Sequence, residues 1–221
     1  MCRMFAYVGN SRKDLGTLYA ALKKAAEYDR TVTWSKDKQH RDGWGCVILT
    51  RDGLIHYRTR TPIFDDDFRL PAFRGRVYSI FHARKASGAK GNPIFSQPFV
   101  AESDRKVFFL AHIGELKAHI PKNTVDTEHA LRKIVEKGGL ENALTQLKKE
   151  TKTALNLLLL EIDRESRGAG IRVFNHWKPG KEDEYYRLYR KGMGGGRAVF
   201  SSTLNYGLGG EACARDEILK L

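Results

Sequence analysis

Cys2 is the residue in this sequence best placed to act as a nucleophile, because it directly follows Met1. An initiator methionine before a small residue is usually removed, which would leave a cysteine with a free α-amine. Such an amine has an ordinary pKa of about 7.7–8.0, so it can accept the thiol proton near neutral pH. One residue would then supply both nucleophile and base. The alternative interpretation is an ordinary cysteine that happens to follow a start codon.

Further segments carry polar groups or glycines where strands end or helices begin. They are HRDGWG at 40–45, HARKASG at 82–88, SQPF at 96–99, AHIGEL at 111–116 and VDTE at 125–128. Arg84 could hold a carboxylate through two hydrogen bonds. The turn at Gly114 could direct backbone N–H groups at an oxyanion. Each segment also has an ordinary interpretation: a surface ion pair for Arg84, a plain strand end for Gly114 and a helix N-cap for Asp126.

In this order, the segments resemble those of the class II glutamine amidotransferases, which belong to the N-terminal nucleophile hydrolases. The opening MCRMFAYVG is similar to the Met-Cys start of that family, HRDGWG to its Asp-Gly-Trp-Gly loop and HARKASG to its His-x-Arg strand end. SQPF, AHIGEL and VDTE resemble its Pro-Phe segment, its His-Asn-Gly turn and its Asp-Thr-Glu sequence. The resemblance covers residues 2–130 and favours the stand-alone type. It implies an α+β fold, a four-layer αββα sandwich of antiparallel sheets.

The resemblance also implies a role for each matching residue. Cys2 would form a γ-glutamyl thioester with glutamine or a γ-glutamyl amide, and the Gly114 N–H would bind the oxyanion. The substrate α-carboxylate would be held by Arg84 with support from Ser87, and its α-ammonium by Asp126. Ammonia would pass to a separate synthase subunit or be released. No cofactor is implied, and without a CxxC pair or an HExxH motif we expect no metal site.

Two positions depart from the family pattern. Ile113 stands where the family has the asparagine that donates to the oxyanion, and loss of one such donor costs roughly 10²–10³ in rate. Lys85 occupies a position where some members have an aromatic residue. The alternatives are therefore another donor, a substrate other than glutamine, or a catalytically impaired glutamine-binding or regulatory module on the same fold.

The spacing of apolar residues predicts the elements that would position these groups. Helical periodicity is found in residues 15–28, 127–137 and 140–150. Strands are expected at 2–9, 44–50, 54–60, 77–83, 107–112, 155–163, 171–176, 185–190 and 198–202. Strands and helices do not alternate regularly, which is typical of α+β proteins with antiparallel sheets. Without a repeat or a linker-like composition, residues 1–221 are expected to form a single domain.

The net charge of +13 raises the question of a nucleic-acid partner. Basic residues exceed acidic ones in every part of the chain and form no Lys/Arg-rich block, which favours a solvated basic surface and no nucleic-acid partner. A folded basic face that attracts RNA or another polyanion is the alternative. No apolar run approaches the roughly 20 residues of a membrane span. We therefore expect a cytoplasmic protein without membrane contact; the sequence indicates no oligomeric state.

Overall fold

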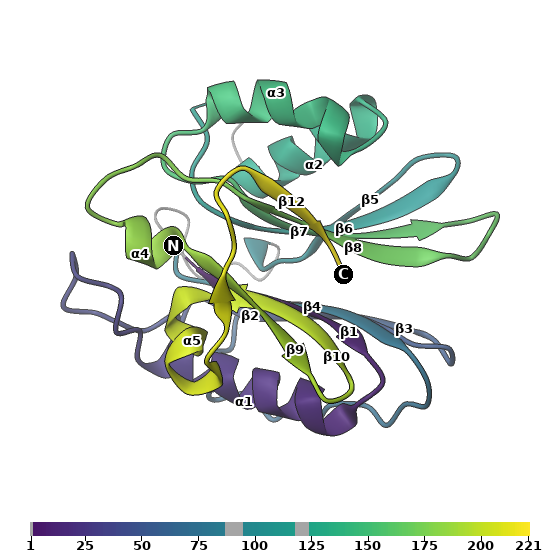
Figure 1. The fold of residues 1–221 in the computed structure, drawn as a ribbon, viewed down its shortest axis with the longest axis horizontal. Helices are drawn as coiled ribbons and strands as arrows, with labels where there is room; N and C mark the ends of the chain where they lie inside the picture. Colours follow the sequence, from purple (N-terminus) through teal and green to yellow (C-terminus); the bar gives the residue numbers. More distant parts are fainter. Residues whose placement is uncertain (1, 87–94, 118–123) are drawn as a thin grey trace.

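The computed structural model describes residues 2–86, 95–117 and 124–221. Two antiparallel sheets lie face to face, and helices cover the outer face of each sheet (Figure 1). The order of layers is helix, sheet, sheet, helix, which confirms the α+β sandwich predicted from the sequence. Within the described ranges, no helix is both long and apolar enough to cross a lipid bilayer.

The larger sheet has the strand β1 at its centre. In spatial order its strands are β11 (Glu211–Ala212), β9 (Leu188–Met193), β10 (Gly196–Ser201), β1 (Arg3–Gly9), β4 (Val77–Ala83), β2 (Trp44–Leu49) and β3 (Leu54–Thr59). Every residue of β1 is buried, because helix α1 (Arg12–Glu27) covers one face of the sheet and the second sheet covers the other. Burial on both faces explains why this strand reads as an almost continuous apolar run.

The smaller sheet lies above the first in Figure 1. Its strands, in spatial order, are β12 (Glu217–Lys220), β8 (Ala169–Asn175), β7 (Asn156–Asp163), β6 (Lys106–Ile113) and β5 (Phe99–Glu102). Helices α2 (Asp126–Glu136) and α3 (Leu140–Glu150) cover its outer face. The short helices α4 (Asp183–Tyr186) and α5 (Ser202–Leu208) flank β9 and β10 along the chain.

Side chains of successive β1 residues enter two different apolar cores, as the period of two along a strand requires. Met4 and Ala6 pack between the two sheets, against Phe109 of β6 among others. Phe5 and Tyr7 pack against α1. A third core lies between the smaller sheet and helices α2 and α3. The layer between the sheets is the one that holds Cys2.

Most of the predicted elements are found within a few residues of their expected bounds, but residues 185–190 differ. Tyr185 and Tyr186 belong to helix α4, and the strand β9 begins only at Leu188. Both tyrosines are buried. Tyrosine favours strands by local preference, which explains why the sequence predicted a strand over these residues. The helix α5 and the strands β5, β11 and β12 were not predicted, because each is short and carries no clear periodicity.

Candidate active site

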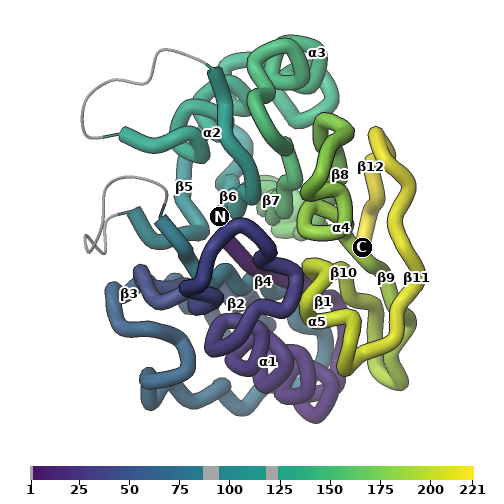
Figure 2. Tube along the Cα trace, turned by 90° about the vertical axis from the view of Figure 1, so that its left-hand side faces the viewer, coloured from purple at the N-terminus to yellow at the C-terminus, as the bar shows by residue number. Residues whose placement is uncertain are grey.

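Cys2 precedes the central strand β1 and belongs to the apolar cluster between the two sheets. Figure 2 shows the N-terminal end of the chain between the elements of the two sheets. Cys2 is 9% exposed, so protein covers most of its surface. Ile113 of β6 and Ala154 belong to the same buried cluster. The Sγ atom of Cys2 lies 3.9 Å from the carbonyl oxygen of Lys85, to which the thiol donates. The thiol therefore sits at one end of the sandwich, beside the chain that leaves β4.

His82 of β4 faces the same layer as Cys2. The ladder pairs His82 with Met4, two residues along β1 from Cys2, and residues two apart in a strand share a face. The imidazole is fully buried, and neither ring nitrogen has a hydrogen-bond partner in the described part of the chain. Burial by itself raises the pKa of a thiol, but the charges of the neighbouring His82 and of the N-terminal amine, together with the contact with Lys85, outweigh burial and lower the pKa of Cys2 to about 6. Such a thiol is largely thiolate at neutral pH.

Arg84 follows β4 and is held by the loop that precedes β2. Its backbone N–H donates to the Gly43 carbonyl at 2.8 Å, and its own carbonyl accepts from the Asp42 N–H at 3.1 Å. The guanidinium donates to the Asp42 carbonyl at 3.3 Å and lies 5.8 Å from the ring centre of Phe95. Arg84 is buried, which argues against the surface ion pair considered for it. The segments HRDGWG and HARKASG are thus in direct contact.

Glycine is required at position 43 of this loop. Its φ of +105° lies in the region that side-chain-bearing residues avoid. A Cβ atom there would come within 2.4 Å of the Thr59 carbonyl oxygen and 2.6 Å of the Ser96 hydroxyl. The glycine therefore allows the loop to approach β3 closely enough to hold Arg84.

Gly114 ends the strand β6 with a φ of +141°. A Cβ atom at this position would lie 1.8 Å from the carbonyl oxygen of Ala154, so the close approach of the two backbones requires glycine. Ile113 immediately before it is 1% exposed and faces the apolar layer between the sheets. Its side chain can donate no hydrogen bond there.

Asp126 is the first residue of α2, and its carboxylate binds the turn after β6. The Leu116 N–H donates to Oδ2 of Asp126 at 2.8 Å. The N-cap position belongs to Val125, whose N–H donates to Glu128 Oε2 at 3.0 Å. The expectation that Asp126 caps the helix is therefore wrong, because its carboxylate is turned toward the AHIGEL segment. This contact joins the AHIGEL and VDTE segments.

Gln97, in the SQPF segment, links the same groups and was not singled out from the sequence. Its Oε1 accepts from the His112 N–H at 2.6 Å, and its Nε2 donates to the Thr127 hydroxyl at 2.8 Å. The side chain is buried, so both ends of the amide are satisfied inside the protein. The position of Gln97 between the HARKASG and AHIGEL segments was the available signal, but a lone glutamine is too common to stand out.

A buried polar network behind Cys2 was also missed. Arg3 donates to Asp29 at 2.5 Å, and His40 Nε2 lies 2.7 Å from the same carboxylate oxygen. Arg3 also donates to the Tyr185 carbonyl at 2.9 Å and lies 3.6 Å from the centre of its ring. The Tyr185 hydroxyl donates to the Cys2 carbonyl at 3.2 Å. Through the Tyr185 hydroxyl, this network holds the backbone carbonyl of Cys2 in place.

The charges of the network follow from its burial. Burial raises the pKa of a carboxyl, but the Arg3 guanidinium, together with His40, holds the pKa of Asp29 well below its usual range. Burial lowers the pKa of His40 to about 4, although the Asp29 carboxylate acts in the opposite direction. His40 is therefore neutral at neutral pH, and one cation, Arg3, faces one anion, Asp29.

Comparison with known proteins shows which known fold the structure matches. No protein-family model matches the sequence, and no curated protein matches it significantly. Among solved structures, glutamine phosphoribosylpyrophosphate (PRPP) amidotransferase from B. subtilis, in complex with ADP and GMP, aligns with a TM-score of 0.63 at 15% identity. The chain has the fold of this amidotransferase. The alignment covers 100% of the chain and 47% of the B. subtilis protein, so the chain spans about half the length of that structure.

A predicted glutamine amidotransferase from Pseudomonas aeruginosa PA01 aligns with a TM-score of 0.42 at 13% identity, over 99% of this chain and 82% of that one. The resemblance to class II glutamine amidotransferases drawn from the sequence motifs is thus confirmed at the level of the fold by the B. subtilis structure. At such identities the comparison supports no residue-by-residue transfer.

The amidotransferase fold gathers the predicted site residues into two connected groups. Cys2 and Arg84 lie together where β1 begins and β4 ends, whereas Gly114 and Asp126 lie together where β6 ends. His112 lies between the groups: burial lowers its pKa, and the charges of Asp126 and His82 both act on it. The fifth predicted residue, Ser87, lies outside the described residues. In the described parts of the chain no cluster of three possible metal ligands occurs.

Proposed function

We propose that the protein hydrolyses the side-chain amide of glutamine, or of a related γ-glutamyl compound, through a thioester on Cys2. The observation that carries this proposal is the buried thiol of Cys2, whose pKa is lowered to about 6 at the start of the central strand of an amidotransferase fold. A thiolate is the nucleophile that amide cleavage requires. Arg84 is buried and lies beside Cys2 where β1 begins and β4 ends. It would supply a cation for an anionic substrate.

The reaction would proceed in two stages. Removal of Met1 exposes the α-amine of Cys2, which holds the proton that the thiol has given up, and the thiolate attacks the amide carbon. A C–S bond forms, and the carbonyl oxygen becomes an oxyanion. The α-ammonium then gives the proton to the amide nitrogen, the C–N bond breaks and ammonia leaves. Water attacks the thioester, the C–S bond breaks, and glutamate leaves as the thiol is restored.

The surrounding residues would bind the substrate. The Arg84 guanidinium would hold the α-carboxylate through paired hydrogen bonds, with Ser87 nearby. Asp126 would accept from the α-ammonium, and its carboxylate is already anchored by the Leu116 N–H. The Gly114 N–H would donate to the oxyanion. The ammonia would pass to a separate synthase or be released directly.

Intact mass spectrometry tests the proposal in one experiment. The purified protein is weighed before and after treatment with a glutamine analogue that carries an electrophile in place of the amide. We expect a chain that lacks Met1 and gains one adduct, with no adduct in Cys2→Ala. Glutamate release should then be measurable and absent in Cys2→Ala. Protein that lacks Met1, yet forms no adduct and hydrolyses no γ-glutamyl compound, would contradict the proposal.

A silent binding module is the second candidate, and Ile113 is the observation that favours it. The isoleucine is buried where a side-chain donor to the oxyanion is expected, and Gly114 alone would leave the transition state poorly stabilised. Such a module would bind glutamine, as measured by titration calorimetry, without releasing ammonia. The two candidates are separated by comparing binding and turnover on the same protein preparation.

A further inference from the structure

The end of the sandwich opposite Cys2 is hollowed between the two sheets. One hollow of about 630 Å³ is lined by residues 49–51, 74–76, Tyr78, 162–164 and 167–169. A second, of about 360 Å³, is lined by residues 8–10, 75–76, Tyr78, Ala169, 195–197 and Leu221. The two share residues 75–76, Tyr78 and Ala169, so they adjoin each other and are described together as one groove.

The groove is remote from the candidate active site. The strand β1 runs from Cys2 at one end to Gly9 and Asn10 at the other, and the latter two line the groove. At about 3.3 Å per residue, the eight steps from Cys2 to Asn10 span about 26 Å. A ligand in the groove would therefore leave the thiol uncovered.

Five arginines line this groove: Arg51, Arg74, Arg76, Arg167 and Arg197, which we call the arginine groove. All five are exposed, and none forms an ion pair with any residue that the structure describes. They come from four separate segments, namely the β2–β3 turn, the loop before β4, the β7–β8 turn and the start of β10. The even spread of charge along the sequence thus hides a local concentration in the fold.

Acidic side chains do not neutralise the arginine groove. Asp163 is the one acidic side chain that lines it. Its Oδ1 already accepts from the backbone N–H groups of Glu165 and Ser166, at 3.1 and 2.8 Å, and from the Ser166 hydroxyl at 2.9 Å. Arg164 also lines the groove but is paired with Glu102, so it is not counted among the five. With five arginines that form no ion pair among the described residues and one carboxylate, the groove carries a net positive charge.

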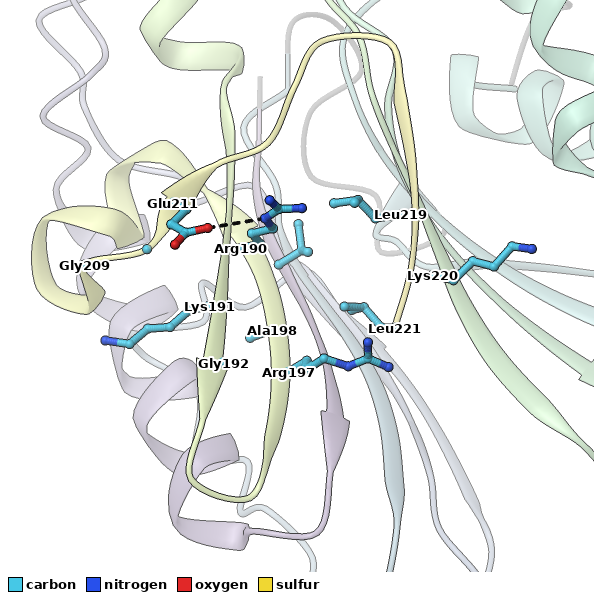
Figure 3. Close-up of a pocket in the computed structure, with 12 residues that line it drawn as sticks. Arg190, Lys191, Gly192, Arg197, Ala198, Gly209, Glu211, Leu219, Lys220 and Leu221 are labelled. Carbon is cyan, nitrogen blue, oxygen red and sulfur yellow. Dashed lines mark ion pairs between the residues drawn. The ribbon is translucent and has the colours of Figure 1, made fainter.

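A neighbouring hollow of about 390 Å³ shares Arg197 and Leu221 with the arginine groove (Figure 3). It differs in that acidic residues pair with one of its arginines. Its Arg190 is paired with Glu211 at 3.7 Å and with Glu217 at 3.6 Å. Figure 3 shows the side chains of Lys191 and Lys220 directed away from this hollow, on opposite sides. Arg197 is therefore the last arginine without an ion pair on this side of the arginine groove.

We propose that the arginine groove binds the phosphate backbone of single-stranded nucleic acid, without reading its sequence. Guanidinium groups suit phosphate oxygens because they donate two parallel hydrogen bonds. The five arginines come from four segments and are distributed over two adjoining hollows, which suits a chain of repeated phosphates better than a single small anion. Tyr78, half-buried and shared by both hollows, offers a ring on which a base can stack.

Fluorescence anisotropy with a labelled short single-stranded oligonucleotide tests this proposal, with RNA and DNA versions of one sequence as separate arms. Five phosphate contacts predict a slope of about −3.5 in a plot of log affinity against log salt, at about −0.7 per contact. The triple variant Arg74→Glu, Arg76→Glu, Arg167→Glu should weaken binding at least about tenfold and flatten the slope by about 2. Absence of binding at about 50 mM salt would overturn the proposal.

The matched control changes the same amount of charge elsewhere. Lys137, Lys149 and Lys178 are exposed and lie outside the groove, so Lys137→Glu, Lys149→Glu, Lys178→Glu should retain most of the affinity. An equal loss in both triple variants would show a non-specific charge effect and contradict the groove. A polyglutamate peptide that binds as tightly as the oligonucleotide would contradict it as well, in favour of an acidic protein partner.

Folding and the amidase proposal can be checked on the same samples. In the milder Arg76→Gln, Arg167→Gln variant, the slope of log affinity against log salt should become flatter by the share of about two phosphate contacts. Its circular dichroism spectrum should stay unchanged. Alkylation of Cys2 should proceed equally in all groove variants, because the thiol lies at the other end of β1. Loss of nucleic-acid binding is thereby distinguished from loss of the thiol site.

Discussion

The Sγ atom of Cys2 lies 3.9 Å from the carbonyl oxygen of Lys85, the residue that follows Arg84. This contact joins the residue just before the central strand β1 to the chain that follows the neighbouring strand β4. Because the ladder pairs Arg3 with Ala83, Cys2 and Arg84 occupy the next positions of the same two chains. The Cys2 thiol and the buried Arg84 are thus neighbours through the register of a single pair of strands.

His82 should control the reactivity of Cys2. The rate of thiol alkylation is expected to rise with pH and to reach half its maximum near pH 6, since the thiolate is the reacting form. In His82→Gln the positive charge is lost while burial remains, so the midpoint should move above the ordinary thiol pKa of about 8.5. A rapid alkylation series over pH measures both midpoints. A midpoint that stays near 6 in this variant would show that His82 has no part in it.

Restoring a side-chain donor at position 113 should raise activity. In Ile113→Asn the new amide can donate to the oxyanion beside Gly114, and we expect glutamate release to increase about 10–100-fold. The buried amide should also lower the free energy of unfolding by about 1–3 kcal/mol. Ile113→Leu serves as the control and should give no gain in rate. A folded Ile113→Asn variant without any gain would indicate that another group already binds the oxyanion.

Gly114 should tolerate no side chain. Gly114→Ala would place a Cβ atom 1.8 Å from the Ala154 carbonyl oxygen at a φ of +141°, so we expect a loss of at least about 2 kcal/mol of stability. Gly170 is the matched control, because a Cβ atom there meets nothing within 4 Å. Gly170→Ala should leave stability unchanged or raise it by about 0.5–1 kcal/mol. Urea unfolding of both variants measures the difference, and equal stabilities would show that β6 and residue 154 do not approach so closely.

Arg84→Lys should separate charge from geometry in substrate binding. The ammonium keeps the charge but cannot hold a carboxylate through two parallel hydrogen bonds, so KM for glutamine should rise about tenfold or more with a smaller change in kcat. Arg41→Lys, at an exposed arginine paired with Asp37, is the control and should leave both constants unchanged. Steady-state glutamate release provides the measurement. An unchanged KM in Arg84→Lys would remove Arg84 from the binding site.

Burial of His40 should make the protein less stable in mild acid. Its pKa is lowered to about 4 in the folded state, against about 6.5 when unfolded, so between these values the unfolded chain binds more protons. The free energy of unfolding should therefore fall as the pH decreases from about 6.5 to about 4, by up to about 1.4 kcal/mol per pH unit from this residue. In His40→Gln this part of the slope should disappear. Denaturant titrations over this pH range compare the slopes, and identical slopes would contradict the prediction.

The sequence predicts the layered fold because several weak motifs occur in a fixed order. The bounds of β4 and α3 agree with the structure almost to the residue, since each is marked by a clear apolar period. The role of Asp126 was less predictable. An acidic residue next to a helix start suits a cap, and only the tertiary contact with Leu116 shows that its carboxylate turns elsewhere.

Other features depend on contacts between residues far apart in the chain. Arg3 lies in an apolar strand, and nothing local indicates that Asp29 and His40 meet it. The arginine groove likewise forms from four segments that are unremarkable one by one. Local patterns predict elements well, whereas charge pairs and surface potentials depend on how those elements are placed in space.

The central position of β1 has a dynamic consequence. Three strands lie on each side of it in the sheet, and both of its faces are covered, so fraying of the sheet edges cannot reach it. Amide protons of β1 should therefore exchange with solvent only when the whole domain opens, later than those of β3 or β11. Cys2 directly precedes the segment with the greatest expected protection, so the geometry around its thiol should persist until global unfolding.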